Sequence, residues 1–481
     1  MPFRALKTTA RLIILVGAVI ATIWIYRAYL ARSLPDLEVW HTYTPMAEFR
    51  AADFPDGISF AEYRKLETRL FDELDKQVFV TGASGNSDRY NRYDKNSIAY
   101  AGEAEQRWNR SFELRPPDAP RGGVLFIHGA SDSPYSARAI SRLFHDHGMY
   151  VLAVRLPGNG TIPSGLRDAR LEDWRAITRM GVQQVRSVIG ADLPLYVAGY
   201  SVGGALALDY ALDAIDKDNL DIPDRLFLVS PAIGIAPAAR LSSWDIALSK
   251  LPVFEKFAWW NIEPEFDPYK YNSFAKNAGH IIHILTADIR RKMSGQARSA
   301  ALPPIITFQS LADTTVRTEE LAEALYSKLP NNGSELILFD INRASNVENF
   351  IGDFGQSLIN DLGTGAPKLF SYTLVTNASR DTLDVVARTR SAGALSFEIT
   401  SLGLRWPETF YSLTHVALPF TPDDRWYGAA EQGVFKLGGL APRGETAILI
   451  TPIHRFMRLR HNPFFDYLAT RTLQFCEACA R

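Results

Sequence analysis

A serine between two glycines is the feature of this sequence whose residue types and spacing most directly indicate chemistry. Ser201 lies in the pentapeptide Gly199-Tyr200-Ser201-Val202-Gly203, which follows an apolar run from Leu195 to Ala198 and precedes a helix-like apolar stretch. A serine on such a tight strand-to-helix turn has strained backbone geometry, and the two glycines leave room where a Cβ would clash. The sequence therefore predicts that Ser201 is a nucleophile.

An acid and a base must accompany this serine, because a serine hydroxyl is a poor nucleophile at neutral pH. At a turn of this kind, the chain order of the three groups is serine, then acid, then histidine. Asp313 directly follows the apolar run Ile305 to Phe308 and is the preferred acid. Asp340 follows the next apolar run and is the second candidate. For either residue, the alternative interpretation is a solvated loop carboxylate.

Three histidines follow the acid in the sequence, and they are His415, His454 and His461. His415 lies in a short run that ends at the acidic turn Thr421 to Asp424. His454 follows the apolar run Ala447 to Ile450 and a Thr-Pro turn, so it too could project from the end of a strand. His461 lies in a basic loop. We predict that His415 is the base, and we keep His454 as the alternative.

Backbone donors for a developing oxyanion are expected next to the serine and at the end of an earlier strand. His128-Gly129-Ala130 comes directly after the apolar run Val124 to Ile127. The N–H groups of Ala130 and Val202 are the predicted donors to a tetrahedral intermediate. The N-terminus of the helix after Ser201 adds a positive dipole end. His128 precedes the serine in the chain, and we expect it to shape the turn rather than act as a base.

Short apolar runs alternate with helical patterns through the middle of the chain. The strand-like runs are 111–115, 124–127, 150–154, 195–198, 226–229, 305–308 and 336–339, and the helix-like segments are 137–147, 171–188 and 204–212. This alternation predicts an α/β fold, with right-handed crossovers and a mainly parallel sheet flanked by helices on both faces. Ligands bind at the carboxyl ends of the strands in such folds.

A long insertion, about 231–300, separates two of these strands and is rich in aromatic residues. They are Trp244, Phe254, Phe257, Trp259, Trp260, Phe266, Tyr269 and Tyr271. The position and composition of the insertion predict a helical lid with an apolar underside above the carboxyl edge of the sheet. The alternative is that these rings pack a small core of the insertion itself.

The N-terminal segment has the composition of a transmembrane helix. Basic residues precede an almost continuous apolar stretch, Leu12 to Tyr26, and snorkelling by Arg27 extends it toward the roughly twenty residues that span a bilayer. We interpret residues 1–35 as an uncleaved membrane anchor, with a signal peptide as the alternative. The preceding basic residues predict that the catalytic domain lies on the extracytoplasmic, periplasmic side.

The other expected divisions follow from these elements. Residues 36–115 form an N-terminal helix and first-strand region, and residues 116–340 form the α/β core with its lid. Residues 341–481 form a C-terminal extension that completes the sheet and carries His415.

The chain has 481 residues, 47% of them apolar, with 52 basic and 53 acidic side chains and a net charge of −1. This composition indicates a globular protein and gives no reason to expect a nucleic-acid partner.

The two cysteines, Cys476 and Cys479, lie close together near the C-terminus. Two thiols are too few for a zinc site, and no redox motif surrounds them. A local disulfide or a pair of free thiols is the expected state.

Together these motifs resemble the α/β-hydrolase superfamily, and within it the serine hydrolases similar to lysophospholipases and monoacylglycerol lipases. The resemblance covers about residues 115–340 and adds Leu156-Pro-Gly-Asn-Gly160 to the motifs above. It implies hydrolysis of acyl esters, including lipid esters, through an acyl-enzyme on Ser201, with His415 as base and Asp313 as orienting acid. It implies no metal and no other cofactor.

This sequence differs from the family pattern at the histidine. The family's histidine usually follows the last core strand by a few residues, whereas here the first candidate comes about seventy residues after Phe339. Either an insertion separates the final strand from its histidine loop, or the sheet continues through 369–375 and 385–390 before the chain returns at His415. Other functions consistent with the sequence are acyl transfer or thioester hydrolysis by the same triad, and a non-catalytic binding module. Enzymes of this fold with an Asp nucleophile are disfavoured by Ser201.

Overall fold

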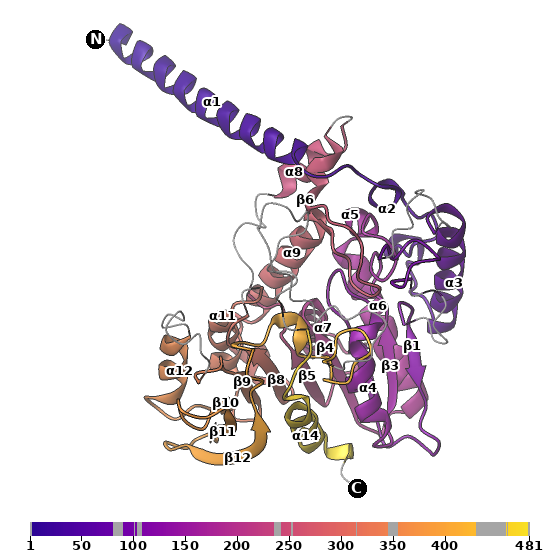
Figure 1. Ribbon diagram of the computed structural model, residues 1–481, viewed down its shortest axis with the longest axis vertical. Helices are drawn as coiled ribbons and strands as arrows, with labels where there is room; N and C mark the ends of the chain where they lie inside the picture. Colours follow the sequence, from indigo (N-terminus) through magenta and orange to yellow (C-terminus); the bar gives the residue numbers. More distant parts are fainter. Residues whose placement is uncertain are drawn as a thin grey trace.

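A single extended sheet organises the computed structural model, which describes residues 2–79, 90–100, 102, 108–234, 242–251, 254–313, 315–344, 355–429, 458 and 460–479. In the described chain, ten strands pair in the order β1-β3-β2-β4-β5-β8-β9-β10-β11-β12 (Figure 1). Their bounds are β1 Phe112–Leu114, β2 Gly123–Ile127, β3 Tyr150–Val154, β4 Leu195–Tyr200, β5 Arg225–Val229, β8 Ile305–Ser310, β9 Glu335–Phe339, β10 Ser371–Asn377, β11 Asp384–Arg390 and β12 Glu398–Arg405. The seven central strands, β3, β2, β4, β5, β8, β9 and β10, are parallel to one another. At the edges, β1 pairs antiparallel with β3, β11 with β10, and β12 with β11.

Helices cover both faces of the sheet, because successive residues of each buried strand point to opposite sides. Leu125 and Ile127 of β2 belong to one apolar core, and Val124 and Phe126 belong to the other. The first core includes residues of α3 Phe60–Gln77, α6 Leu171–Ile189, α7 Val202–Asp216 and α9 Lys276–Lys292. The second includes residues of α4 Arg138–His145 and α14 Phe465–Phe475. The predicted α/β fold, with a mainly parallel sheet flanked by helices, is confirmed.

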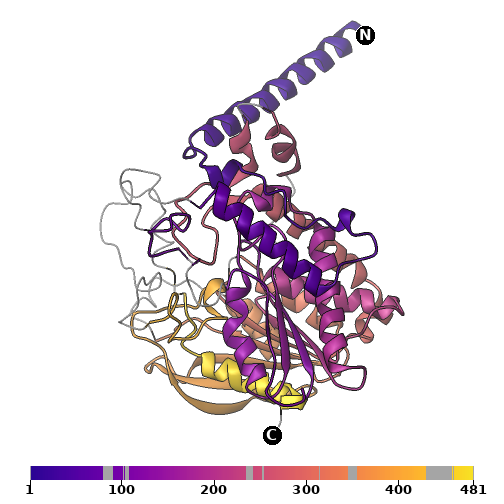
Figure 2. The same ribbon diagram turned by 90° about the vertical axis from the view of Figure 1, so that its right-hand side faces the viewer.

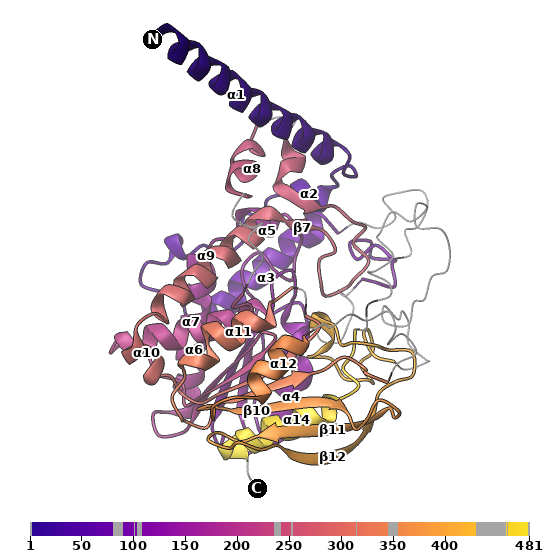
Figure 3. The same cartoon turned by 90° about the vertical axis from the view of Figure 1, so that its left-hand side faces the viewer.

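The sheet continues beyond its parallel part before the chain returns to the centre of the molecule. Strand β10 pairs parallel with β9, and β11 and β12 then extend the sheet as antiparallel strands. Helix α12 Gln356–Gly363 lies beside them, and the Arg390 side chain of β11 donates to the Leu362 carbonyl at 3.2 Å (Figure 3). After β12 the chain reaches the short helix η7 His415–Ala417. Of the two expected routes to His415, the structure therefore has the one in which the sheet is longer.

The insertion between β5 and β8 lies at the carboxyl ends of the strands, as the sequence predicts. Its described elements are α8 Ser242–Leu248, η4 Glu255–Ala258, β6 Trp259–Asn261, β7 Phe274–Ala275, α9 and α10 Gln296–Ala300. Strands β6 and β7 form a separate two-stranded sheet. The remaining short helices are α2 Val39–Thr42, η1 Ala51–Asp53, η2 Pro134–Ala137, α5 Gly165–Asp168, α11 Thr318–Ala324, η5 Tyr326–Lys328 and η8 Glu477–Cys479. A disulfide joins Cys476 to Cys479.

Helix α1 Pro2–Arg32 projects away from the body of the molecule (Figures 1 and 2). Its part Ile14–Arg32, with a mean hydropathy of 1.8, is the one helix of the described chain that is long and apolar enough to cross a membrane. Within the described residues, its C-terminal end contacts the body, where Arg27 forms an ion pair with Asp245 of α8. Such a helix serves either as a membrane anchor or as a signal sequence.

A buried ion-pair network joins the N-terminal segment to the loop after β3. Arg155 is fully buried and contacts the carboxylates of Glu48 at 2.9 Å and Glu67 at 3.1 Å. Glu67 lies on α3 and also accepts a hydrogen bond from the Ser111 hydroxyl, just before β1. The Arg155 carbonyl accepts from the Tyr63 hydroxyl of α3 at 2.7 Å. These contacts fix α3 at the β1 edge of the sheet.

Candidate active site

Ser201 lies on a sharp turn between β4 and α7. Its backbone has φ 55° and ψ −117°, a conformation that costs free energy in any residue other than glycine. A Cβ on Gly203 would lie 2.0 Å from the Ile127 carbonyl oxygen, and a Cβ on Gly199 would lie 2.3 Å from the Gly203 carbonyl carbon. Gly203 is therefore required for the close packing of the turn against β2, and Gly199 for the close approach of β4 to the start of α7. The turn exposes the Ser201 side chain in a cavity of about 240 Å³.

The predicted acid and base lie in contact although they are far apart in the sequence. His415 Nδ1 lies 2.8 Å from Asp313 Oδ2, and both side chains are buried. Asp313 Oδ1 accepts from the N–H groups of Thr315 at 2.8 Å and Val316 at 2.9 Å. Burial raises the pKa of Asp313, but the charge of His415 and these hydrogen bonds outweigh it and hold the pKa below its usual range. The pair is therefore arranged to keep an ionised carboxylate next to the imidazole.

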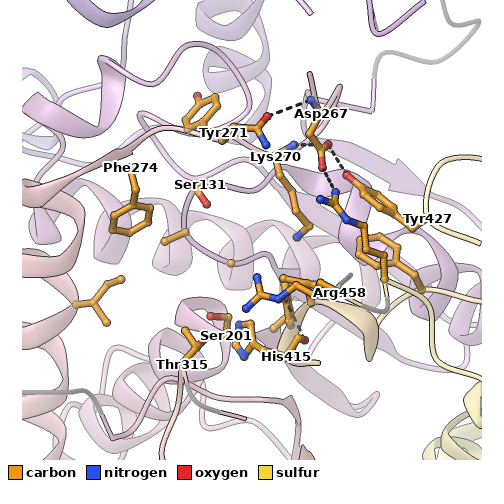
Figure 4. A pocket seen from close by; sticks show the side chains of 18 residues that line it. Ser131, Ser201, Asp267, Lys270, Tyr271, Phe274, Thr315, His415, Tyr427 and Arg458 are labelled. Atoms are coloured by element: carbon orange, nitrogen blue, oxygen red, sulfur yellow. Dashed lines mark hydrogen bonds and ion pairs between the residues drawn. The ribbon is translucent and has the colours of Figure 1, made fainter. Parts of the chain in front are cut away.

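Two hydrogen bonds hold the loop that carries His415. The Ser310 hydroxyl, at the end of β8, donates to the Leu413 carbonyl at 2.8 Å. The Tyr200 hydroxyl, at the end of β4, reaches the His415 carbonyl at 3.4 Å. As a result, His415 lines the same cavity as Ser201 (Figure 4).

The alternative acid and bases occupy other surroundings. Asp340 contacts Arg343 at 2.8 Å and accepts from the Thr376 hydroxyl at 2.7 Å, in a separate buried cluster. His461 is buried beside the Phe410 ring, and burial lowers its pKa; it does not line the Ser201 cavity. His454 lies outside the described residues.

The loop after β2 borders the serine where the oxyanion donors are expected. Gly129, Ala130 and Ser131 line the cavity, and a Cβ on Gly129 would lie 3.2 Å from the Ser201 Cβ. The N–H groups of Ala130 and Val202 donate to no acceptor within the described chain. Ser131 has a positive φ of 57°, which turns the loop sharply.

His128 supports this loop from the interior. Its Nε2 accepts from the Leu156 N–H at 3.0 Å, and its Nδ1 lies 2.7 Å from the Gly129 carbonyl oxygen. Burial lowers the pKa of His128 to about 4, so the ring is neutral at physiological pH. This geometry agrees with the expected role in shaping the turn.

The roof of the cavity carries polar as well as apolar side chains, so the predicted apolar underside describes only part of what the insertion contributes. The insertion contributes Asp267, Lys270, Tyr271, Asn272, Phe274 and Ile282 to the lining. Among the described aromatic residues that the sequence singled out in the insertion, only Tyr271 reaches the cavity. The others pack elsewhere. Tyr269 stacks on Tyr135 with 3.7 Å between the ring centroids, and Trp259 packs edge-on against His41.

Three cationic side chains of the cavity were missed by the sequence reasoning: Lys270, Arg458 and Arg460. Lys270 contacts the buried Asp132 at 2.9 Å, and Arg460 contacts Asp267 at 3.1 Å. The only sequence signal was a lysine within the aromatic run Tyr269 to Tyr271 and a basic loop near the C-terminus. Neither pattern indicates that the two segments meet, because that contact depends on the C-terminal extension folding back over the insertion.

The described residues contain no group of three or more His, Cys, Asp or Glu side chains arranged to hold a metal ion. The chemistry that the arrangement can support directly is nucleophilic attack by a serine, assisted by an oriented imidazole.

Part of this chain is similar in sequence to known hydrolases. The model of the Alpha/beta hydrolase family matches residues 124–316. A curated relative, the thermostable monoacylglycerol lipase of Bacillus sp. (strain H-257), is 30% identical over 86 residues, which are 18% of this chain and 33% of the lipase. The chain thus spans about a third of the length of this relative.

Two solved structures with similar folds are more distant in sequence. One, of a pair of metagenome-derived lipolytic enzymes, has 20% identity and a TM-score of 0.39, and the match covers 53% of this chain and 96% of that chain. The other is a soluble variant of monoglyceride lipase from Saccharomyces cerevisiae, with 17% identity and a TM-score of 0.38 over 48% of this chain and 82% of that chain.

Proposed function

Because this chain contains an α/β-hydrolase domain that resembles monoacylglycerol lipase-like enzymes, we propose that it is a serine hydrolase that cleaves carboxylic esters through an acyl-enzyme on Ser201. The observation that carries this proposal is the contact of 2.8 Å between Asp313 and His415 at the cavity that Ser201 lines. A non-catalytic module would have no need for an imidazole oriented in this way beside a strained serine.

In the proposed mechanism, Asp313 accepts a hydrogen bond from the Nδ1–H of His415, so Nε2 is free to act as the base. The Ser201 Oγ attacks the ester carbonyl carbon while Nε2 takes its proton. The N–H groups of Ala130 and Val202 then stabilise the tetrahedral oxyanion. His415 returns the proton to the leaving alcohol, and water resolves the acyl-enzyme by the same steps.

The catalytic unit in this proposal comprises the core 116–340 and the extension 341–481, since the first supplies Ser201 and Asp313 and the second supplies His415. The cavity of about 240 Å³ is smaller than the roughly 300–1,000 Å³ typical of ligand sites. A short acyl ester, or the ester end of a longer lipid, fits this size.

We further propose that α1 anchors the protein in a membrane with the catalytic domain on the extracytoplasmic side. Apolar side chains of α1 are exposed, among them Val19 at 51% and Ile23 at 52%, and no part of the described body covers them. The disulfide between Cys476 and Cys479 supports an oxidising compartment for the other end of the chain.

Labelling with a fluorophosphonate probe tests the proposed nucleophile. We expect the probe to modify Ser201, and we expect Ser201→Ala to lose hydrolysis of short p-nitrophenyl esters by a factor on the order of 10⁴–10⁶. A probe adduct on another residue, or substantial turnover by the variant, contradicts the proposal. Product analysis with and without an added alcohol separates hydrolysis from acyl transfer.

A further inference from the structure

The lining of the Ser201 cavity differs in character on its two sides. Phe274 and Ile282 of the insertion form an apolar side, whereas Lys270, Arg458 and Arg460 form a cationic side. Figure 4 shows Phe274 on one side of the cavity and the side chains of Lys270 and Arg458 on the other, with their charged ends directed toward the region of Ser201 and His415. An ester bound here has its two ends in different surroundings.

We propose that the ester cleaved at Ser201 carries an anionic group on its alcohol side, which Lys270 and Arg458 bind while the acyl chain lies against Phe274 and Ile282. This inference rests on the proposed function and narrows its substrate class. The shared chemistry is a compact anion, a phosphate or a carboxylate, because ammonium and guanidinium groups donate charge-assisted hydrogen bonds to both.

The environment of Lys270 keeps its ammonium group in place. Its side chain is 14% exposed, and Nζ lies 2.9 Å from Asp132 Oδ2. Nζ also lies over the rings of Tyr200 and Phe420, at 5.0 Å and 5.3 Å from their centroids. A lysine held by a buried carboxylate and two rings has lost most of its rotamer freedom before a ligand arrives, which lowers the entropic cost of binding.

Arg460 adds a positive charge to the cavity and holds Asp267 of the insertion in place. Its Nη1 lies 3.1 Å from Asp267 Oδ2, and Asp267 Oδ1 accepts from the Tyr427 hydroxyl at 2.6 Å. The buried Nε of Arg460 has no hydrogen-bond partner within the described chain. A buried donor without a partner costs free energy, which an anion in the cavity reduces by its charge.

The donor groups of the cationic side favour an anion over a neutral head group. Lys270 pairs with Asp132 and Arg460 pairs with Asp267, but an ammonium has three N–H donors and a guanidinium has five, so one carboxylate does not use all of them. An anion accepts charge-assisted hydrogen bonds from such donors, whereas a glycerol or simple alcohol accepts only weaker ones.

Two matched pairs of substrates test the proposal, with butyrate release as the readout. The phosphate pair is 1-butyrylglycerol 3-phosphate and 1-butyrylglycerol; the carboxylate pair is 3-(butyryloxy)propanoate and propyl butyrate. We expect the full-length enzyme to have a kcat/KM about 10- to 100-fold higher for the anionic member of at least one pair. The pair with the larger ratio identifies the anion.

Lys270→Met is expected to reduce the ratio of kcat/KM for the anionic ester to kcat/KM for the neutral ester at least about tenfold. The main cause is a higher KM for the anionic ester. Arg458→Gln, at a half-buried position of the same side, is expected to change the ratio in the same direction. Lys276→Met is the matched control, since Lys276 also lies in the insertion, is 12% exposed and contacts a buried carboxylate, Asp245, but does not line the cavity. This control is expected to keep the wild-type ratio.

Equal kcat/KM values for both members of each pair overturn the inference and leave the proposed hydrolase function intact. The same holds if Lys270→Met and Arg458→Gln lower anionic and neutral turnover by equal factors. If no ester is cleaved and the fluorophosphonate does not label Ser201, both the inference and the proposed function are wrong.

Discussion

At the scale of single residues, the site depends on groups that are costly to hold in place. Ser201 has a positive φ of 55°, and the packing of Gly199 and Gly203 against their neighbours maintains it. Asp313 is buried but keeps its charge through His415 and two backbone N–H groups. Strain and buried charge persist where the surrounding structure compensates them, and they concentrate at functional sites.

The role of His415 can be separated from that of the other histidines. We expect His415→Ala to lower kcat for a p-nitrophenyl ester by a factor on the order of 10⁴–10⁶, as for the serine variant, because the two residues act as a unit. His461→Ala is the matched control, since His461 is also buried but does not line the cavity. A severe loss in His454→Ala instead of His415→Ala would refute the assignment of the base.

A second residue-scale prediction concerns Glu265 in the insertion. Burial raises the pKa of Glu265 to about 7, although the charge of Arg92 and the N–H groups of Ser273 and Asn272 oppose the shift. The folded protein therefore keeps a proton on Glu265 between pH of about 4.5 and about 7 that the unfolded chain has released. This contribution to stability is complete below that window and is lost as the pH rises through about 7.

Glu265→Gln cannot ionise, so its Tm relative to the wild type should increase by about 1–3 °C between pH 5 and pH 8, measured by thermal unfolding. Any cost of the lost acceptor oxygen is independent of pH and does not affect this trend. Glu255→Gln, at an exposed position of the same insertion, is the control and should show a constant difference. A constant difference for Glu265→Gln as well would contradict the expected titration.

At the scale of elements, the C-terminal extension brings the proposed base, His415, to the cavity of the proposed nucleophile, Ser201. Strands β10 to β12 lengthen the sheet, and the chain then returns to η7, where the Ser310 and Tyr200 hydroxyls hold the loop. The apolar runs 369–375 and 385–390 indicated β10 and β11 as one of two alternatives. Strand β12 was missed because it is an edge strand with mostly exposed residues, so it lacks the buried alternation that marks a strand in a sequence.

Buried ion pairs of Arg155 attach the N-terminal segment to the sheet. We expect Arg155→Met to reduce the free energy of unfolding by about 3–5 kcal/mol, because Glu48 and Glu67 lose their buried cation. Denaturant unfolding followed by circular dichroism measures the change.

Arg115→Met serves as the control for this prediction, since its ion pair with Glu113 is largely exposed and is expected to contribute little. If the two variants unfold at the same denaturant concentration, the network around Arg155 does not stabilise the fold.

At the scale of the whole molecule, the described part of the proposed anchor contacts the proposed catalytic unit where the end of α1 meets the insertion. Lys256 of η4 donates to the Leu34 carbonyl at 2.8 Å, and Arg27 pairs with Asp245. The insertion that roofs the cavity is thus also the part of the body beside the anchor.

The anchor can be tested in the intact chain. The double variant Val19→Asp and Ile23→Asp should move the protein from the membrane fraction to the soluble fraction, because each charge costs about 2.5–3.5 kcal/mol at the centre of a spanning helix. Val39→Asp, at an exposed apolar position outside the span, should stay with the membrane. Retention of the double variant after a carbonate wash would exclude α1 as the anchor.

The sequence by itself determined the parts of this protein that depend on local patterns. The strand–Ser201–helix turn, the alternation of buried strands with amphipathic helices and the apolar N-terminal helix all follow from residues close together in the chain.

Only the tertiary structure decided which distant residues meet at the cavity. Asp313 and His415 are 102 positions apart, and the choice of His415 over His461 depends on where the extension returns after β12. The cationic side depends on the same return, since Lys270 comes from the insertion and Arg458 from near the C-terminus. Such contacts leave no periodic signal in a sequence, because they are fixed by the packing of whole elements and not by the neighbours of each residue.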